Sequence, residues 1–286
     1  MAEVLTASTV VQAEPERGRR RTGLVPIIAG SVLALIVLAC VVGPWLMSSD
    51  SGTALSTDRF AGISGAHWLG TDELGRDLFA RVLRAGRISL GVAGGATLVA
   101  MLLGAAWGMI AAFSRGLVDE ILMRLADVTM AAPQMLLALI FVAAFGATPV
   151  KLAVIVGILL TPVTARMIRS AVLTERAEDY YIAAIAFGAP KWRLILTEVL
   201  PNVWAPIGVQ SAINVANGII LEAALSFIGL GIQDPDISWG LLLKYGFSMQ
   251  SRSLGYMLYP AATIFVTIWM LNLLADQLGR TKGGRR

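Results

Sequence analysis

Four polar side chains interrupt an otherwise apolar run in the last third of the chain, and their types suit the handling of a polar solute inside a membrane. They are Gln210, Asn214, Asn217 and Glu222. At about 100° per residue, Asn214, Gly218 and Glu222 fall within about 80° of one another and share one helix face. Because a carboxylate that faces lipid is costly, Glu222 should point into a helix bundle or an aqueous path. The four residues therefore form either part of a translocation pathway or a buried hydrogen-bond set.

Catalysis has no candidate residues in this sequence. It holds one histidine, His67, and one cysteine, Cys40, so neither a Ser-His-Asp set nor a metal cluster of His or Cys is predicted. No G-x-x-x-x-G-K-[ST] motif occurs, so the chain should not bind ATP through a phosphate-binding loop. We therefore predict no enzyme activity, no metal site and no cofactor bound by this chain. The acidic pairs are predicted to be solvated loop charges: Asp72 and Glu73, Asp119 and Glu120, and Glu178 and Asp179.

Two long apolar segments are separated by the polar and amphipathic island DYYIAAIAFGAPKWRLILTEVLPN. It is predicted to form two short helices at a membrane surface. Asp179 should cap the first helix, and Gly188 should supply the left-handed residue that ends it. Pro190 suits the first turn of the second helix, and Pro201, which lacks an N–H, is predicted to stop that helix near Leu200.

Small residues should give the first of these two helices a smooth surface. Gly188 lies about one turn after Ala184 and about one and a third turns after Ala183, so a partner can approach the backbone closely there. A helix of about eight residues is marginal in water, because isolated helices need roughly 12 to 15 residues. The sequence therefore predicts that a neighbouring surface holds this helix.

Membrane spans are the elements that must position these residues. Of the 286 residues, 56% are hydrophobic and 15% are charged, and the mean hydropathy is +0.72, which is too apolar for an ordinary soluble domain. Uncharged stretches of about 23 residues are long enough to cross roughly 30 Å of hydrocarbon. We predict an all-α, polytopic membrane protein with six transmembrane helices, at residues 23–47, 88–113, 128–150, the weaker stretch between Lys151 and Arg166, 199–221 and 253–275.

The distribution of basic residues predicts an orientation in the lipid bilayer. Most of the 23 Lys and Arg residues lie in segments that would face the cytoplasm, which places both termini there. The basic cluster of Arg76, Arg81, Arg84 and Arg87 fits this orientation least well. No stripe of basic residues interleaved with aromatics occurs, so nucleic acid is not a predicted partner. The predicted layout is a disordered cytoplasmic tail at 1–22, the first span at 23–47, an external segment at 48–86, a core of five spans at 87–276 with a cytoplasmic loop at 174–202, and a basic cytoplasmic tail at 277–286.

Glycines in the second predicted span indicate close helix packing. Gly104 and Gly108 form a GxxxG pattern, and Gly91, Gly94 and Gly95 lie one stretch earlier. Small residues let membrane helices approach closely enough for dispersion to hold them together. We therefore predict a packing role for these positions.

The spacing of residues in the island resembles a known family motif. Two small residues, a glycine four positions later and a Leu-Pro pair twelve positions after that resemble the cytoplasmic "EAA" loop of bacterial ABC importer permeases. The motif's glutamate is replaced here by Ile182. Three more stretches look like segments of the dipeptide/oligopeptide/nickel permease family, in the second, "C-type", of its two permease subunits: LGTDELGRDLFARVLRAGRISL, VDEILMRLADVTMAAPQMLLAL and LEAALSFIGLGIQDPDISWG. The resemblance covers roughly residues 65–280.

This resemblance implies a type I ABC importer permease in the cell membrane of a bacterium. It further implies a second homologous permease subunit, two ATPase subunits or one fused ATPase that carry the ATP and Mg²⁺, and an extracytoplasmic substrate-binding protein. In that family the EAA loop docks into a cleft of the ATPase. The positions of this chain that would form the docking loop, residues 174–202, are Asp179, Ala183, Ala184, Gly188, Ala189, Leu200 and Pro201.

Three functions are compatible with the sequence. The leading hypothesis is a permease subunit that forms half of the pathway for di- and oligopeptides. The same type of importer can instead carry nickel complexes or another small solute. A third hypothesis is an ion-coupled secondary carrier that works alone, because Glu222 and the asparagines are the kind of residues that such carriers use in mid-membrane.

Overall fold

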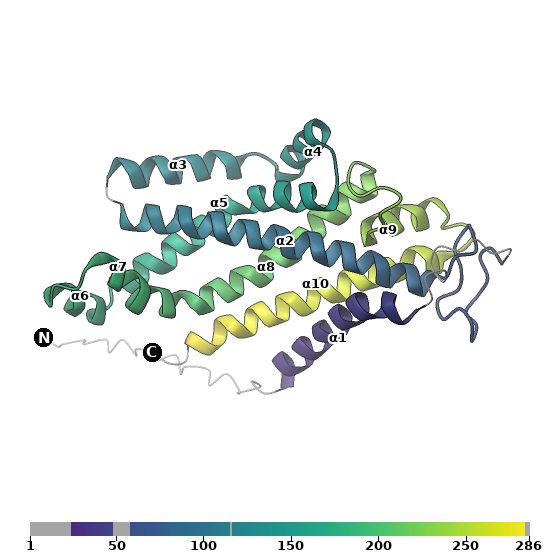
Figure 1. Cartoon of the computed structure of the whole chain (residues 1–286), viewed down its shortest axis with the longest axis horizontal. Coiled ribbons are helices and arrows are strands. Elements are labelled where there is room, and N and C mark those ends of the chain that lie inside the picture. Colours follow the sequence, from purple (N-terminus) through teal and green to yellow (C-terminus); the bar gives the residue numbers. More distant parts are fainter. Residues whose placement is uncertain (1–23, 48–57, 115, 284–286) are drawn as a thin grey trace, which may run out of the picture.

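The structure is a computed structural model that describes residues 24–47, 58–114 and 116–283, and in this part the chain is helical without strands (Figure 1). A lone β-bridge joins Thr71 and Asp77. The predicted all-α class is therefore confirmed. The predicted tail at 1–22 lies outside the described residues. The elements are α1 (Leu24–Leu46), α2 (Leu78–Phe113), α3 (Leu117–Ala131), α4 (Gln134–Phe145), α5 (Pro149–Arg176), α6 (Asp179–Ala186), α7 (Lys191–Arg193), the π-helical segment η1 (Leu194–Val199), α8 (Leu200–Ile228), α9 (Trp239–Ser248) and α10 (Leu254–Gly283).

In the described part, five helical stretches are long and apolar enough to cross a membrane, and there are six if the bent pair α3 and α4 is counted as one span. The continuous span predicted at 128–150 is wrong. It covers only the end of α3, the whole of α4 and the start of α5, and helices α3 and α4 meet at 87° with Pro133 at the break. The residue before a proline is disfavoured in helical conformation, and Ala132 is accordingly extended, with φ −79° and ψ 138°.

Helices extend into two segments that the sequence predicts to lie outside the membrane. Residues 78–86 of the segment predicted at 48–86 are helical, because α2 starts at Leu78 with the Asp77 carboxylate accepting from the N–H of Ala80 at 2.8 Å. The tail predicted at 277–286 is helical up to Gly283. The length of an uncharged stretch predicts the membrane-crossing part of a helix, whereas the helix itself can continue through charged turns outside the hydrocarbon.

The long helices lie lengthwise beside one another, as Figure 1 shows. Helices α2, α5 and α8 pack against one another at the centre, with α1 and α10 on one side and α3 and α4 on the other. Helix α6 lies at one end of this bundle, and residues 58–77 lie at the opposite end. The start of α1 and the end of α10 point towards the end that carries α6.

Glycines allow α2 and α5 to touch through their backbones. A Cβ atom built on Gly108 would lie 2.5 Å from the Ala165 carbonyl oxygen, and one on Gly104 would lie 2.7 Å from Thr164 Cβ. The predicted packing role of the GxxxG pattern therefore holds at these two positions. Of the three earlier glycines, a Cβ on Gly95 would lie 3.1 Å from Ala153 Cβ of α5, whereas one on Gly91 or Gly94 would meet nothing of this chain within 4 Å.

We expect Gly108→Ala to destabilise the purified chain, because α5 must move away from the new methyl group. Overpacking of this kind costs about 1 to 3 kcal/mol. Gly94→Ala is the matched control, since it adds the same methyl in open space on the same helix. Thermal unfolding in nanodiscs should show a lower midpoint for Gly108→Ala and an unchanged or higher one for Gly94→Ala. Equal midpoints for the two variants would contradict this packing.

Candidate functional site

Helix α6 is the first helix of the predicted docking loop. Its N-cap is one residue earlier than predicted. Glu178 occupies the N-cap, with φ −76° and ψ 147°, and its carbonyl accepts from the N–H groups of Tyr181 and Ile182. Asp179, which was predicted to be the cap, is the first residue of α6. There its carboxylate lies near the positive end of the helix dipole, which also favours an acidic residue.

The end of α6 follows the sequence prediction. Gly188 has φ +77°, the left-handed conformation that favours glycine. Its N–H donates to the Ile185 carbonyl at 2.9 Å, and the Ala189 N–H donates to the Ala184 carbonyl at 3.1 Å. This pair of bonds is the Schellman arrangement, which satisfies the last carbonyls of a helix. Gly188 thus turns the chain sharply into Pro190 and α7.

The second helix of the loop does not stop at Pro201. The chain continues from α7 through the π-helical segment into α8, and Pro201 lies in the first turn of α8. The hydrogen-bond register changes just before it, where the Leu200 N–H donates to the Ile195 carbonyl five residues back. A proline in a first turn removes no bond that the helix needs. The predicted stop near Leu200 is therefore wrong.

The outer surface of α6 is apolar and open. Tyr181 is the buried residue of this helix, and Ala184, Ala189 and Leu200 pack against the same cluster beneath it. Ala183 and Gly188 lie on the outside, so the predicted small surface is split between two faces. Large apolar side chains dominate the outside: Ile182, Ile185, Trp192 and above all Phe187, which is 92% exposed.

Tyr180 connects α6 to α5 and α8 through hydrogen bonds of its hydroxyl. Its hydroxyl donates to the Glu175 carboxylate at 2.5 Å and accepts from the Asn202 amide at 3.1 Å. Partial burial and the neighbouring Glu175 raise the pKa of Tyr180 to about 12. The hydroxyl therefore stays protonated near neutral pH and can keep donating to Glu175.

The polar residues of α8 divide into two groups. The Gln210 amide donates to Asn214 Oδ1 at 2.9 Å, and the Asn214 amide donates to Thr164 Oγ1 of α5 at 2.9 Å. Gln210 and Asn214 are buried, whereas Asn217 is half-buried further along the same helix. This chain of bonds joins α8 to α5 and does not include Glu222.

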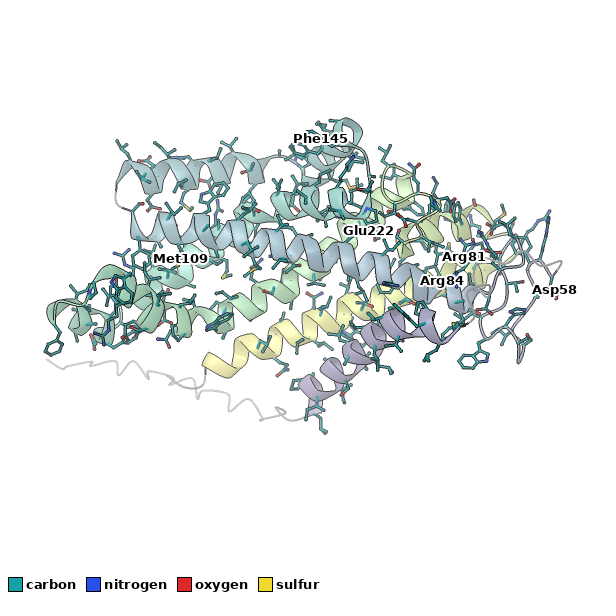
Figure 2. The ribbon with its side chains drawn as sticks, viewed as in Figure 1. Asp58, Arg81, Arg84, Met109, Phe145 and Glu222 are labelled. Atoms are coloured by element: carbon teal, nitrogen blue, oxygen red, sulfur yellow. The ribbon has the colours of Figure 1, made fainter. Side chains whose placement is uncertain are left out.

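Glu222 of α8 lies inside the bundle (Figure 2), where it contacts Ser89 of α2 and Ser238, the N-cap of α9. It is fully buried and accepts from Ser89 Oγ at 2.8 Å and Ser226 Oγ at 2.7 Å, with Ser238 as a further partner. Ser89 in turn accepts from the Trp239 N–H at 3.1 Å. These contacts are those of the buried hydrogen-bond alternative. The spacing of Glu222 and Ser226, one helical turn apart, could have predicted their contact from the sequence. Nothing in the sequence connects Glu222 with Ser89 or Ser238.

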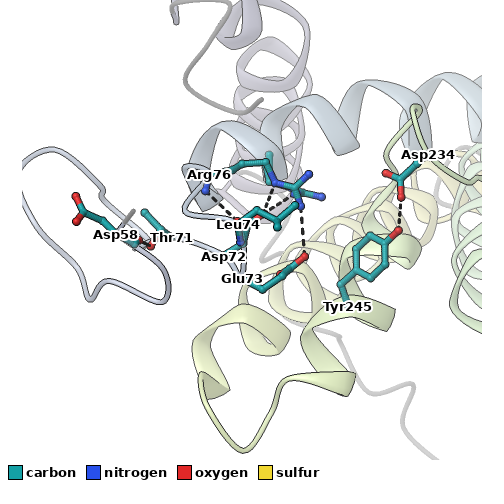
Figure 3. A network of polar contacts seen from close by, with 9 residues as sticks. Asp58, Thr71, Asp72, Glu73, Leu74, Arg76, Asp234 and Tyr245 are labelled. Atoms are coloured by element: carbon teal, nitrogen blue, oxygen red, sulfur yellow. Dashed lines mark hydrogen bonds and ion pairs between the residues drawn. The ribbon is translucent and has the colours of Figure 1, made fainter. Parts of the chain in front are cut away.

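Asp72 is not the solvated loop charge that the sequence predicts (Figure 3). It is fully buried, and its carboxylate accepts from Arg76 Nε at 2.7 Å and from Arg81 Nη1 at 2.5 Å. Although burial opposes it, the carboxylates of Asp72 and Glu73 raise the pKa of Arg76 above its ordinary value. The same pairing accounts for two of the four arginines that fitted the predicted orientation least well.

A second acidic residue of these pairs has a structural partner. Asp119 makes a two-point ion pair with Arg169, at 2.6 and 2.5 Å, which ties α3 to α5. Glu178 occupies the N-cap of α6 through its backbone carbonyl, and its carboxylate makes no capping hydrogen bond. Among the residues described, no group of three or more His, Cys, Asp or Glu side chains is placed to hold a metal ion.

Known proteins with this sequence pattern are transport components. The family described as "Binding-protein-dependent transport system inner membrane component" matches residues 104–281. The glutathione transport system permease protein GsiD of Pectobacterium atrosepticum is 35% identical, over 89% of this chain and 85% of that protein. The oligopeptide transport system permease protein OppC of Bacillus subtilis is 30% identical, over 91% of this chain and 85% of that protein. The probable D,D-dipeptide transport system permease protein DdpC of Escherichia coli is 32% identical, over 87% and 84%.

The fold is also found among solved structures. A chain of the methionine ABC transporter MetNI, in an inward-facing conformation, superposes with a TM-score of 0.59 at 14% identity. The match covers 70% of this chain and 95% of that chain, which confirms the expected type I ABC importer permease fold. In importers of this type, ATP is hydrolysed by separate ATPase subunits, and the permease itself is not an enzyme. The chain therefore belongs to the family of binding-protein-dependent transport system inner membrane components, the membrane-spanning permease subunits of ABC importers.

Proposed function

We propose that this permease forms half of a translocation pathway for short peptides that an external binding protein delivers. The support for peptide cargo comes from the relatives, whose names include oligopeptide, dipeptide and glutathione transport. All of these solutes carry peptide-like amide groups. The alternative cargo, a nickel complex or another small solute, has no corresponding name among these relatives.

The observation that carries the mechanism is the surface of the docking loop. An exposed apolar tip built from Ile182, Ile185 and Phe187 at the end of a bundle is costly unless a partner covers it. An ATPase subunit that closes around this tip would gain that burial. We propose that the two ATPase subunits, or one fused ATPase, dock here with their ATP and Mg²⁺. When the ATPases bind ATP, a shift of α6 would then move the membrane spans.

The proposed assembly also fixes an orientation. The docking loop must face the cytoplasm to reach an ATPase, and the start of α1 and the end of α10 point towards the same end of the bundle (Figure 1). Both termini are therefore proposed to be cytoplasmic, in a bacterial cell membrane. A second homologous permease subunit completes the pathway, and the binding protein docks at the end that carries residues 58–77.

Gln210, Asn214, Asn217 and Glu222 remain the proposed polar residues near the pathway. Asn217 has the strongest case, because its side chain is half-buried in this chain and retains surface for cargo or for the second permease. The other three are buried in contacts within the chain. Their proposed contribution is to fix the position of α8, which carries Asn217.

Uptake of a labelled dipeptide tests the proposal. The chain would be reconstituted in proteoliposomes with its second permease, its ATPases and its binding protein. We expect uptake to require ATP on the side of the liposome membrane that carries the ATPases, and to continue when a protonophore is added. Unlabelled di- and tripeptides should inhibit it, whereas nickel complexes should not. Uptake that persists without ATP and collapses with the protonophore would instead support the ion-coupled carrier.

A further inference from the structure

Arg176, the last residue of α5, lies where three helices meet. Its guanidinium donates to the carbonyl of Ala112 in the last turn of α2. The same group lies over the ring of Phe113, at 5.0 Å from the centroid, and over the ring of Tyr181, at 6.0 Å. Phe113 ends α2 and Tyr181 belongs to α6, so one side chain of α5 joins the docking helix to the second span.

The contact matters because it is a polar link between α6 and α2, beside the apolar packing of Tyr181 and Ala184. Tyr181 is the buried residue of α6, and its ring reaches Arg176. On the other side, Tyr180 links α6 to Glu175 and to Asn202 at the start of α8. Beside this apolar packing, a displacement of α6 can reach the bundle through the polar contacts of Tyr180 with α8 and of Arg176 with α2.

The chemistry of the contact requires an arginine. The planar guanidinium presents a face to aromatic rings while its edge still donates hydrogen bonds, whereas a lysine ammonium is a compact point charge. The Ala112 carbonyl is among the last carbonyls of α2, which have no partner within the helix. Arg176 thus satisfies the end of one helix and holds the ring of another at the same time.

We propose that Arg176 is a positioning residue that transmits the movement of α6 to α2 during transport. This inference rests on the proposed docking of an ATPase at α6, and it adds the route by which the docked helix moves the spans. Without Arg176, the ATPases still bind the exposed tip of the loop, but their closure moves α6 without moving α2. The predicted defect is in coupling and not in docking.

The test measures the peptide molecules taken up per ATP hydrolysed, in proteoliposomes that hold the complete importer. Arg176→Ala should keep the ATPases bound and should lower this ratio about tenfold, the size expected from losing a cation–π contact and a charge-assisted hydrogen bond. Arg176→Lys should recover only part of it. Arg124→Ala is the control, because Arg124 is an exposed basic residue of α3, outside the docking loop, and its loss should leave the ratio unchanged.

Further variants separate the possible failures. Should Arg176→Ala not fold, Tyr181→Leu and Phe113→Leu remove the two rings and leave the arginine in place, and each should lower the ratio too. Combined with Arg176→Ala, the Tyr181→Leu change should lower the ratio no further. A ratio for Arg176→Ala within about twofold of the wild type would overturn the proposal, since the lost contacts predict a larger change. If no ATPase co-purifies with the wild-type chain, the docking proposal itself has failed.

Discussion

Phe187→Ser is expected to weaken ATPase binding to this permease by about 10-fold to 100-fold and to lower peptide uptake accordingly. The Phe187 ring is 92% exposed at the tip of the docking loop, so almost all of its surface is free for a partner to bury. Full burial of a phenylalanine side chain contributes about 1.5 to 3 kcal/mol, and each 1.4 kcal/mol changes an affinity about tenfold. Binding would be measured with purified ATPase and the permease in nanodiscs.

The folded chain should hardly respond to the same substitution, because a side chain this exposed makes few contacts within its own chain. Trp68→Ser is the matched control. Trp68 is another exposed aromatic residue, 65% exposed, but it lies in the segment at the opposite end of the bundle. We expect the control to bind ATPase as the wild type does. Unchanged ATPase affinity in Phe187→Ser would remove this tip from the proposed docking site.

The docking loop was predictable to the extent that its signals are local. Gly188 ends α6 because no other residue adopts a left-handed conformation as easily, and this property belongs to a single residue. The meaning of Pro201 depends on its neighbours instead. A proline disturbs a helix through its missing N–H and through the clash of its ring with the preceding turn, and the π-helical turn just before Pro201 changes the hydrogen-bond register there. The sequence alone does not show that turn.

The polar sites were less predictable because their partners lie far away along the chain. Glu222 pairs with Ser89, which is 133 positions earlier. The sequence alone predicts that Glu222 is either a pathway residue or a buried hydrogen-bond partner. Only the packing of α2 against α8 brings Ser89 within hydrogen-bond distance of it. The prediction for Asp72 was wrong for a related reason. A short acidic motif is typical of a solvated loop, and the sequence does not show that Arg81 of α2 pairs with Asp72.

Replacing Asp72 by alanine is expected to cost about 3 to 5 kcal/mol of unfolding free energy, the usual penalty for removing one partner of a buried ion pair. Arg81 is only 2% exposed, so its charge would remain buried without the carboxylate that balances it. The loss also frees the N–H groups of Leu74 and Arg76, which donate to the same carboxylate at 2.8 and 2.9 Å. Unfolding of the purified permease in nanodiscs would measure the change.

A second substitution shows whether the buried charge causes this loss. In Asp72→Ala combined with Arg81→Leu, no unpaired guanidinium is left inside the protein, so part of the stability should return, as buried ion pairs replaced on both sides are often tolerated. Arg76 needs no compensation, because it keeps its 3.3 Å contact with Glu73 and is partly exposed. Glu73→Gln is the milder control, since Glu73 is itself partly exposed. If the double variant is as unstable as Asp72→Ala, the lost backbone contacts and not the charge of Arg81 determine how firmly this end of α2 is held.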